Sequence, residues 1–371
     1  MTGMAQPVFV HVGLMKSGTT YLQHTLRANG EEVLRQGVGI VPQKRSVSFR
    51  MALDLRGLAG PGTGRRKGGG SFRRLPRKLA RAEGERLLFT EEVLSGCSPE
   101  QVAVFGETLG DREVHVVFTI RDIARSIPSM WQQSVKGGRS HTYDDYVGSV
   151  IRRKGKGATH FWTSQDAVAL LERWTAIAPP ERIHVVVVPH AGAPRDLLLE
   201  RFCSVLGLDA SLLTNAPKRT NDSLGRAQVE LLRRINEGLS EDARRSDLHG
   251  EVVKRPFALG ILAQQPGEKI LLSKQYADWC HEHAITAIAA IRAAGYRVVG
   301  DLDELLPDES VYATDLPPVD EAAVAESAVD GLVALMEERV ASRVAEIEER
   351  AAARAERRRA ARSGQGGGRK A

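Results

Sequence analysis

The chain has 371 residues, of which 42% are hydrophobic, and a formal net charge of +6. This length and composition predict a globular protein with one large core or two smaller ones. No stretch approaches the ~20 apolar residues that cross a bilayer, and no basic region followed by an apolar leader precedes the first strand. The scattered Cys97, Cys203 and Cys280 form neither a zinc pattern nor a disulfide framework. We therefore expect a cytoplasmic protein without a membrane span.

An apolar, β-branched run at residues 7–12 predicts a buried strand, and residues 19–29 predict an amphipathic helix. The turn between them is rich in glycine and hydroxyl side chains. Its distinctive residues are Gly13, Lys16, Ser17, Gly18, Thr19 and Thr20. A helix N-terminus leaves backbone N–H groups unpaired and carries partial positive charge, so a phosphate binds well there. The sequence therefore predicts an anion-binding loop; the alternative is a glycine-rich turn with a surface lysine.

The spacing within this loop separates two classes of phosphate-binding protein. A Walker A loop has its lysine directly after the second glycine, whereas Lys16 stands two residues before Gly18. The order Lys-Ser-Gly-Thr-Thr resembles the loop of sulfotransferases that use 3′-phosphoadenosine 5′-phosphosulfate (PAPS). The resemblance implies that Lys16, Ser17, Gly18, Thr19 and Thr20 bind the phosphate next to the sulfuryl group.

Between residues 37 and 91 the pattern predicts a short strand at 37–41, a basic helix at 73–83 and a strand at 86–90. This last strand ends at Glu91. A partly buried carboxylate there can be tuned toward neutrality, and in many sulfotransferases a glutamate or a histidine takes the proton of the acceptor. Glu91 is therefore our candidate base. The alternative is an acidic residue in the first turn of a following helix.

A near-continuous apolar run at residues 113–120 predicts a central parallel strand. Arg121 follows it directly, and Ser129 comes eight residues later, about two helical turns on. A guanidinium and a hydroxyl at these positions could hold the same anion. The pair resembles the sulfotransferase segment that binds the 3′-phosphate of PAPS, which implies this role for Arg121 and Ser129. The alternatives are an ion pair of Arg121 with Asp122 or Asp111, and a surface hydroxyl at Ser129.

Strands and helices continue to alternate as far as the apolar run at residues 182–188, and a late edge strand is predicted at 296–299. We therefore expect an α/β fold with a central parallel sheet flanked by helices and a helical C-terminal region. The resemblance implies the P-loop NTPase-like sulfotransferase fold. The predicted divisions are an α/β domain at 1–306, a linker at 307–319, a long amphipathic helix at 320–362 and a disordered basic tail at 363–371.

The long helix at 320–362 carries a thin apolar stripe. Its members step by threes and fours: Val329, Val333, Met336, Val340, Val344, Ile347 and Ala351. This spacing suits a coiled coil with a second copy of the chain, or a helix laid on the body. A solvated single helix is equally compatible with it.

Two basic clusters, at residues 65–81 and 350–370, should attract anions. The second lacks the interleaved aromatic residues of single-strand binders, so we expect no specific nucleic-acid partner. The role of the first cluster stays open. Residues 219–224 resemble a later nucleotide-proximal segment of some bacterial sulfotransferases, but they also suit a helix cap.

The resemblance implies a sulfotransferase that moves a sulfuryl group from PAPS to an acceptor hydroxyl. Lys16 would stabilise charge on the bridging oxygen and Glu91 would accept the proton. No His/Asp/Glu cluster has ligand spacing, so no metal is expected. The acceptor, a small molecule or the hydroxyl of a glycan or lipid, cannot be identified from the sequence. The alternatives are a P-loop kinase or ATPase, and a non-catalytic helical scaffold.

Overall fold

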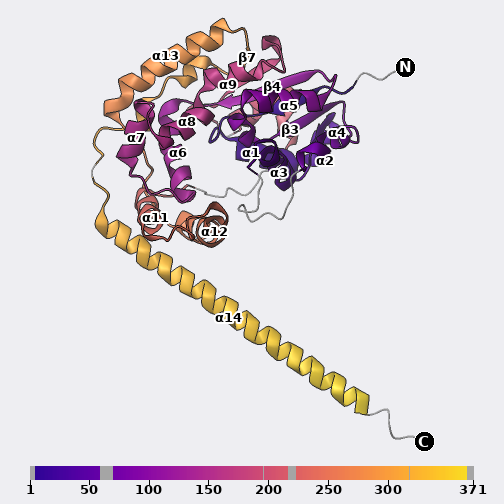
Figure 1. Cartoon of the computed structure of the whole chain (residues 1–371), viewed down its shortest axis with the longest axis vertical. Helices are drawn as coiled ribbons and strands as arrows, with labels where there is room; N and C mark the ends of the chain where they lie inside the picture. Colours follow the sequence, from indigo (N-terminus) through magenta and orange to yellow (C-terminus); the bar gives the residue numbers. More distant parts are fainter. Residues whose placement is uncertain (1–4, 59–69, 195, 216–222, 317, 366–371) are drawn as a thin grey trace, which may run out of the picture.

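The computed structural model describes residues 5–58, 70–194, 196–215, 223–316 and 318–365. Within these residues the central sheet has six strands, all parallel, in the order β2-β3-β1-β4-β5-β7 (Figure 1). The strands are β1 (Val8–His11), β2 (Val38–Ile40), β3 (Arg86–Thr90), β4 (Val114–Ile120), β5 (Ile183–Val187) and β7 (Arg297–Val299). The predicted parallel α/β fold is confirmed.

The inner strands are buried on both sides because helices cover both faces of the sheet, which is why they read as continuous apolar runs. Alternate residues of β4 enter different cores. Phe118 packs with Phe105 and Trp174 on one face, and Val117 packs with Leu22 on the other.

The first face is covered by α5 (Pro99–Leu109), α9 (Ala167–Trp174) and α13 (Ala277–Ala293). The second face is covered by α1 (Thr19–Ala28) and α10 (Leu197–Leu206). Shorter helices complete the edge of the sheet near β2: α2 (Gly30–Arg35), α3 (Arg45–Leu55) and α4 (Leu75–Leu79).

A third core lies beside the sheet and is helical. Its helices are α6 (Ile123–Lys136), α7 (Tyr143–Ile151), α8 (Lys156–Gln165) and α11 (Arg226–Gly238), with a π-helix, η6 (Gly250–Leu259). A short helix, α12 (Ser246–His249), precedes η6. Trp131 and Phe161 are buried between these helices. Only α11, α12 and η6 belong to the expected helical C-terminal region; α6, α7 and α8 lie between β4 and β5 in the chain.

The predicted linker at 307–319 contains short ordered elements where the structure describes it. A 3-10 helix, η10 (Glu309–Val311), leads into β8 (Tyr312–Ala313), which pairs in parallel with β6 (Leu272–Ser273). Val311 is buried in the helical core. These contacts attach the segment to the body.

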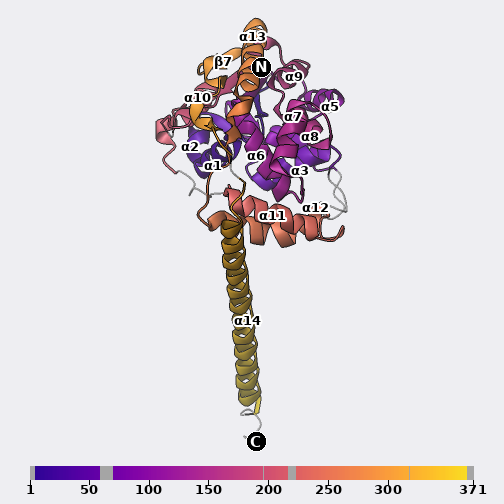
Figure 2. The same ribbon diagram turned by 90° about the vertical axis from the view of Figure 1, so that its left-hand side faces the viewer.

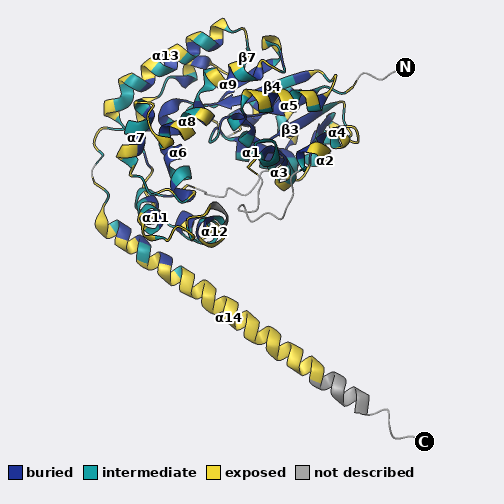
Figure 3. Cartoon of the chain, in the orientation of Figure 1, coloured by how far each residue is buried: buried dark blue, intermediate teal, exposed yellow. Residues whose placement is uncertain are grey.

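The terminal helix α14 (Glu321–Gln365) projects from the body (Figures 1 and 2). Its first turns pack on the body, where Val324 and Ser327 are buried. From residue 335 to residue 357 every side chain is exposed, as Figure 3 shows. The predicted alternative of a helix laid on the body therefore applies only to the start of α14. Residues 366–371 of the predicted tail lie outside the described chain.

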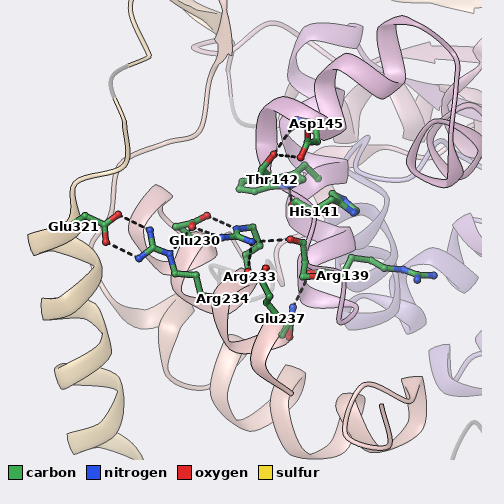
Figure 4. Close-up of polar contacts among 12 residues, drawn as sticks. Arg139, His141, Thr142, Asp145, Glu230, Arg233, Arg234, Glu237 and Glu321 are labelled. Carbon is green, nitrogen blue, oxygen red and sulfur yellow. Dashed lines mark hydrogen bonds and ion pairs between the residues drawn. The ribbon is translucent and has the colours of Figure 1, made fainter. Parts of the chain in front are cut away.

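Polar contacts connect the start of α14 with α11 (Figure 4). Arg234 donates two hydrogen bonds to Glu321, at 2.7 and 2.6 Å. The neighbouring Arg233 pairs with Glu230 and donates to the carbonyl oxygen of Ser140, before α7, at 2.9 Å.

None of the described helices is both long and apolar enough to pass through a membrane.

Candidate functional site

The strand order creates one topological switch point. From β1 the chain continues toward β2 on one side, and from β4 it continues toward β5 on the other. The crevice beyond the carboxyl ends of β1 and β4 is where open α/β sheets bind ligands. Lys16 follows β1 and Arg121 follows β4, so both predicted cationic residues belong to this edge.

The loop after β1 has an unusual backbone. Gly13, Lys16 and Gly18 have φ angles of 57°, 67° and 82°. A Cβ on Gly13 would lie 2.5 Å from Cγ2 of Thr19 and 2.9 Å from Oγ1 of Thr119, so only glycine fits there. A lysine in the left-handed region is uncommon, and such strain is often found at ligand-binding sites.

Helix α1 begins without the features that usually neutralise a helix N-terminus. Its N-cap is Gly18, no side chain among the described residues caps the first turn, and the first turn contains no acidic residue. The N–H groups of Thr19 and Thr20 have no intrahelical acceptor by helix geometry, and the positive end of the helix dipole is uncompensated. Together with Lys16, these are the kinds of group that can bind an anion.

Ser17 differs from its predicted role. Its side chain is buried, and its hydroxyl donates to the carbonyl oxygen of Leu14 at 2.6 Å and lies 2.6 Å from Oγ1 of Thr119. The hydroxyl thus fixes the loop against β4 instead of facing the crevice. The amide of Ser17 also donates to the carbonyl oxygen of Leu14, at 3.3 Å. In this structure both donors of Ser17 therefore stabilise the loop itself.

Beneath the loop, hydrogen bonds join three strands through His11. Its Nδ1 lies 2.8 Å from Oγ1 of Thr90, and its Nε2 lies 3.4 Å from Oγ1 of Thr119. Burial, with a smaller contribution from Arg27, lowers the pKa of His11 to about 3. The ring is neutral at physiological pH and serves as a structural link between β1, β3 and β4.

Arg121 and Ser129 are in direct contact. Nη2 of Arg121 donates to Oγ of Ser129 at 3.1 Å and to the carbonyl oxygen of Arg125 at 2.7 Å. Its buried Nε has no hydrogen-bond partner among the described residues. Burial lowers the pKa of Arg121 to about 10, which still leaves it charged at neutral pH. Asp122 pairs with Arg125 instead, so the alternative ion pair with Arg121 does not form.

The loop after β1 contacts β4 at Thr119, close to the end of that strand. The amide of Leu14 donates to the carbonyl oxygen of Thr119 at 3.0 Å, and the Thr119 hydroxyl contacts Ser17. Arg121 is two residues beyond Thr119, hence about 7 Å further along an extended chain and on the same side of the strand. The two predicted cationic centres are therefore neighbours in the fold.

Glu91 is fully buried. It is the N-cap of a 3-10 helix, η3 (Glu92–Gly96), and its carboxylate accepts from the amide of Val93 and from Oγ of Ser48, both at 3.5 Å. Burial, followed by the charge of Glu92, raises the pKa of Glu91 to about 8, although Arg45 and Arg27 oppose the shift. The raised pKa agrees with the expected tuning, while the cap position matches the alternative.

Sequence reasoning missed the polar residues around Glu91. Gln23 of α1 donates to Glu92 at 2.6 Å and accepts from Arg45 of α3 at 2.8 Å. Arg27, one turn after Gln23, contacts Ser48 at 3.4 Å. The sequence pattern that could have revealed them is the i, i+4 placement of Gln23 and Arg27 beside the buried apolar face of α1.

Two cavities lie near these residues. The larger, of about 1470 Å³, is bordered by α4, α2, the end of α1 and the segment after β2; neither Lys16 nor Arg121 lines it. A small one, of about 30 Å³, is lined by Leu14, Arg121 and residues of α13. Beside it, Gln165 donates to the carbonyl oxygen of Met15 at 2.8 Å and so supports the loop.

In the described part of the chain, no three His, Cys, Asp or Glu side chains gather to hold a metal ion. The nucleotide-proximal segment predicted at 219–224 falls largely on residues 216–222, outside the described residues.

No protein-family model and no curated protein matches the chain. Among solved structures, a sulfotransferase from Alicyclobacillus acidocaldarius is similar to it, with 14% sequence identity, coverage of 79% of this chain and 97% of that chain, and a TM-score of 0.45. A likeness this distant says nothing about ligand or reaction.

Proposed function

We propose that the protein is a sulfotransferase that moves a sulfuryl group from PAPS to an acceptor hydroxyl. One observation carries the proposal: two separate cationic centres adjoin one switch point. The first is Lys16 at the uncapped start of α1, and the second is Arg121 with Ser129. PAPS has phosphates at both its 3′ and 5′ ends, whereas ATP carries all of its phosphates at the 5′ end. Two centres therefore suit PAPS better.

In the proposed reaction the acceptor oxygen attacks the sulfur of PAPS. A new oxygen–sulfur bond forms while the bond from sulfur to the bridging oxygen of the 5′-phosphate breaks, and the electron pair stays on that bridging oxygen. Lys16 and the first-turn amides of α1 stabilise the resulting charge. The Arg121–Ser129 pair holds the 3′-phosphate and so orients the donor.

The acceptor proton passes to Glu91. A carboxylate with a pKa of about 8 is a stronger base than an exposed one once it is ionised. Because Glu91 is buried behind Ser48 and Arg27, the proposal includes displacement of these two side chains when an acceptor enters. Activity should then rise with pH toward about 8, as Glu91 loses its proton.

The test compares thermal shifts with 3′-phosphoadenosine 5′-phosphate and with ATP plus magnesium, followed by transfer of labelled sulfate from PAPS. A sulfotransferase is stabilised by the bisphosphate. A kinase or ATPase would respond to ATP alone, and a scaffold to neither. Lys16→Ala should abolish transfer, while Lys154→Ala, at an exposed lysine of another loop, should not. Full transfer by Lys16→Ala would exclude the mechanism.

A further inference from the structure

The larger cavity has a strongly basic wall. Arg74, Arg77, Lys78 and Arg81 all line it, and their spacing places them on one face of a helical segment. Leu75 and Leu79, on the other face, are buried in the core. This packing fixes the orientation of α4, which carries Arg77 and Lys78; Arg74 directly precedes α4 and Arg81 follows it.

Acidic residues in the described part of the chain do not neutralise the charge of this wall. Among the described residues that line the cavity, seven are basic and three are acidic. Arg35 is paired with Glu32, but no ion pair within the described chain joins Arg74, Arg77, Lys78 or Arg81 to a carboxylate. The cavity therefore has an excess of guanidinium and ammonium groups available to an anion.

The rest of the lining narrows the class of anion. The described residues of the lining include no Phe, Tyr or Trp, but they include the exposed amide and hydroxyl groups of Gln43, Thr214 and Asn215. Nucleobases are usually held by aromatic stacking, whereas amides and hydroxyls pair well with sugar hydroxyls. A volume of about 1470 Å³ exceeds the roughly 300–1,000 Å³ typical of drug-sized ligands, so the cavity has room for several sugar units.

A short path leads from this cavity to Glu91. Arg27 lines the cavity and contacts Oγ of Ser48 at 3.4 Å, and Ser48 contacts the carboxylate of Glu91 at 3.5 Å. We propose that the cavity binds an acidic oligosaccharide and that one of its hydroxyls is the sulfate acceptor. The acceptor role rests on the proposed function; the binding role does not.

The test measures binding of a heparin-derived hexasaccharide to the full chain by calorimetry, with neutral maltohexaose and oligo(dT) as comparison probes. The Arg77→Glu/Arg81→Glu variant should lose at least about tenfold in affinity for the acidic sugar. The control Arg73→Glu alters an exposed arginine of the same segment that does not line the cavity, and it should bind normally.

The outcomes separate this inference from the proposed function. The oligosaccharide site would be overturned if maltohexaose bound as tightly as the hexasaccharide, or if oligo(dT) bound more tightly. It would also be overturned if Arg73→Glu lost as much affinity as Arg77→Glu/Arg81→Glu. Binding of 3′-phosphoadenosine 5′-phosphate is measured on the same samples. If the wild type binds the hexasaccharide but not 3′-phosphoadenosine 5′-phosphate, the proposed sulfotransferase function is wrong and the sugar site stands. Retained nucleotide binding in Arg77→Glu/Arg81→Glu shows that the variant is folded.

A second inference comes independently from α14. Of the fourteen large hydrophobic residues that are exposed in the described chain, eight lie on this helix. The stripe steps by 4, 3, 4, 4, 3 and 4 residues from Val329 to Ala351, which is an 11-residue repeat. Such a repeat has about 3.67 residues per turn and stays on one face of a nearly straight helix.

The stripe is symmetric about Val340. An antiparallel second copy centred there places Val333 level with Ile347, Met336 level with Val344, and Val340 level with itself. Residues 321–338 contain five acidic and no basic residues, whereas residues 339–365 contain eight basic and four acidic ones. Antiparallel pairing puts the acidic half beside the basic half, and parallel pairing puts like charges together. We infer that α14 forms an antiparallel dimer with a second copy.

The test is light scattering of the full chain with cysteine cross-linking. Val340→Glu should give a monomer, while Ser342→Glu, on the opposite side of the exposed helix, should stay dimeric. Under oxidation Val340→Cys should cross-link and Val333→Cys should not, because only position 340 meets itself in an antiparallel pair. A monomeric wild type, or cross-linking at both positions, would overturn the inference.

Discussion

Nη2 of Arg121 lies 3.1 Å from Oγ of Ser129, two residues that are eight positions apart in the chain. The contact forms because Arg121 leaves the end of β4 and folds back along the first two turns of α6. Ser129 also donates to the carbonyl oxygen of Arg125. The buried guanidinium is thus oriented before any ligand arrives, and its Nε remains an unused donor in the described structure.

The first prediction concerns this pair. Arg121→Lys keeps the charge but loses the planar fork, so affinity for 3′-phosphoadenosine 5′-phosphate should fall by about tenfold or more. Ser129→Ala removes one hydroxyl, and affinity for the same nucleotide should fall roughly tenfold if that hydroxyl contacts the phosphate. Isothermal titration of each variant provides the measurement. Ser126→Ala is the control, because among the described residues its hydroxyl bonds to the carbonyl oxygen of Asp122 and not to Arg121. An equal loss of affinity in this variant would indicate a general disturbance of α6.

The second prediction concerns the backbone of the loop. Gly13→Ala combines a left-handed conformation with a Cβ 2.5 Å from Thr19, so the free energy of unfolding should fall by about 3 kcal/mol. Gly207→Ala shares the left-handed conformation but meets only ordinary contacts, with the side chain of Arg86, and should cost about 1 kcal/mol. Urea unfolding measures both. Similar losses would show that the loop can relax around a Cβ.

The third prediction concerns pH. The folded state holds the proton of Glu91 up to about pH 8, above the ordinary value of 4.5. Between these values the folded state binds more protons than the unfolded state, so this group makes stability fall as pH rises. Glu91→Gln cannot ionise. Its melting temperature relative to wild type should therefore increase from pH 5 to pH 8.5.

The control for this pH series is Glu107→Gln, at an exposed carboxylate of α5. Its melting temperature should follow that of the wild type at every pH. If the melting temperatures of wild type and Glu91→Gln change with pH in parallel, Glu91 is already ionised in the folded protein at pH 5. Burial would then not raise its pKa.

The fourth prediction concerns the attachment of α14. A Cβ at Gly331 would lie 3.3 Å from the ring of Phe257, so Gly331→Leu should push the first turns of α14 off the body. Hydrogen exchange of residues 321–334 should accelerate markedly. Arg234→Ala removes the pair with Glu321, but exposed ion pairs contribute little, so exchange should change only slightly. The reverse order of effects would make the ion pair the main attachment.

The sequence by itself determined the strands of the central parallel sheet and predicted the edge at which a site would lie. Buried parallel strands leave continuous apolar runs, so the segments at 86–90 and 113–120 could be placed almost to the residue. The eight-residue spacing of Arg121 and Ser129 matches two helical turns, a local geometry that a linear pattern encodes. Because parallel strands end at one edge of a sheet, the sequence alone predicts Lys16, Glu91 and Arg121 at that edge.

Only the tertiary structure decided which way the side chains face. Ser17 turns inward because Thr119, on a neighbouring strand, offers it a partner at 2.6 Å. Glu91 is neutralised by burial behind α3, and Arg27 joins it to a basic cavity. These contacts unite residues far apart in sequence, and no local pattern records them. The same holds for α14: its stripe is visible in the sequence, but only the packing of the body shows that the stripe is left uncovered.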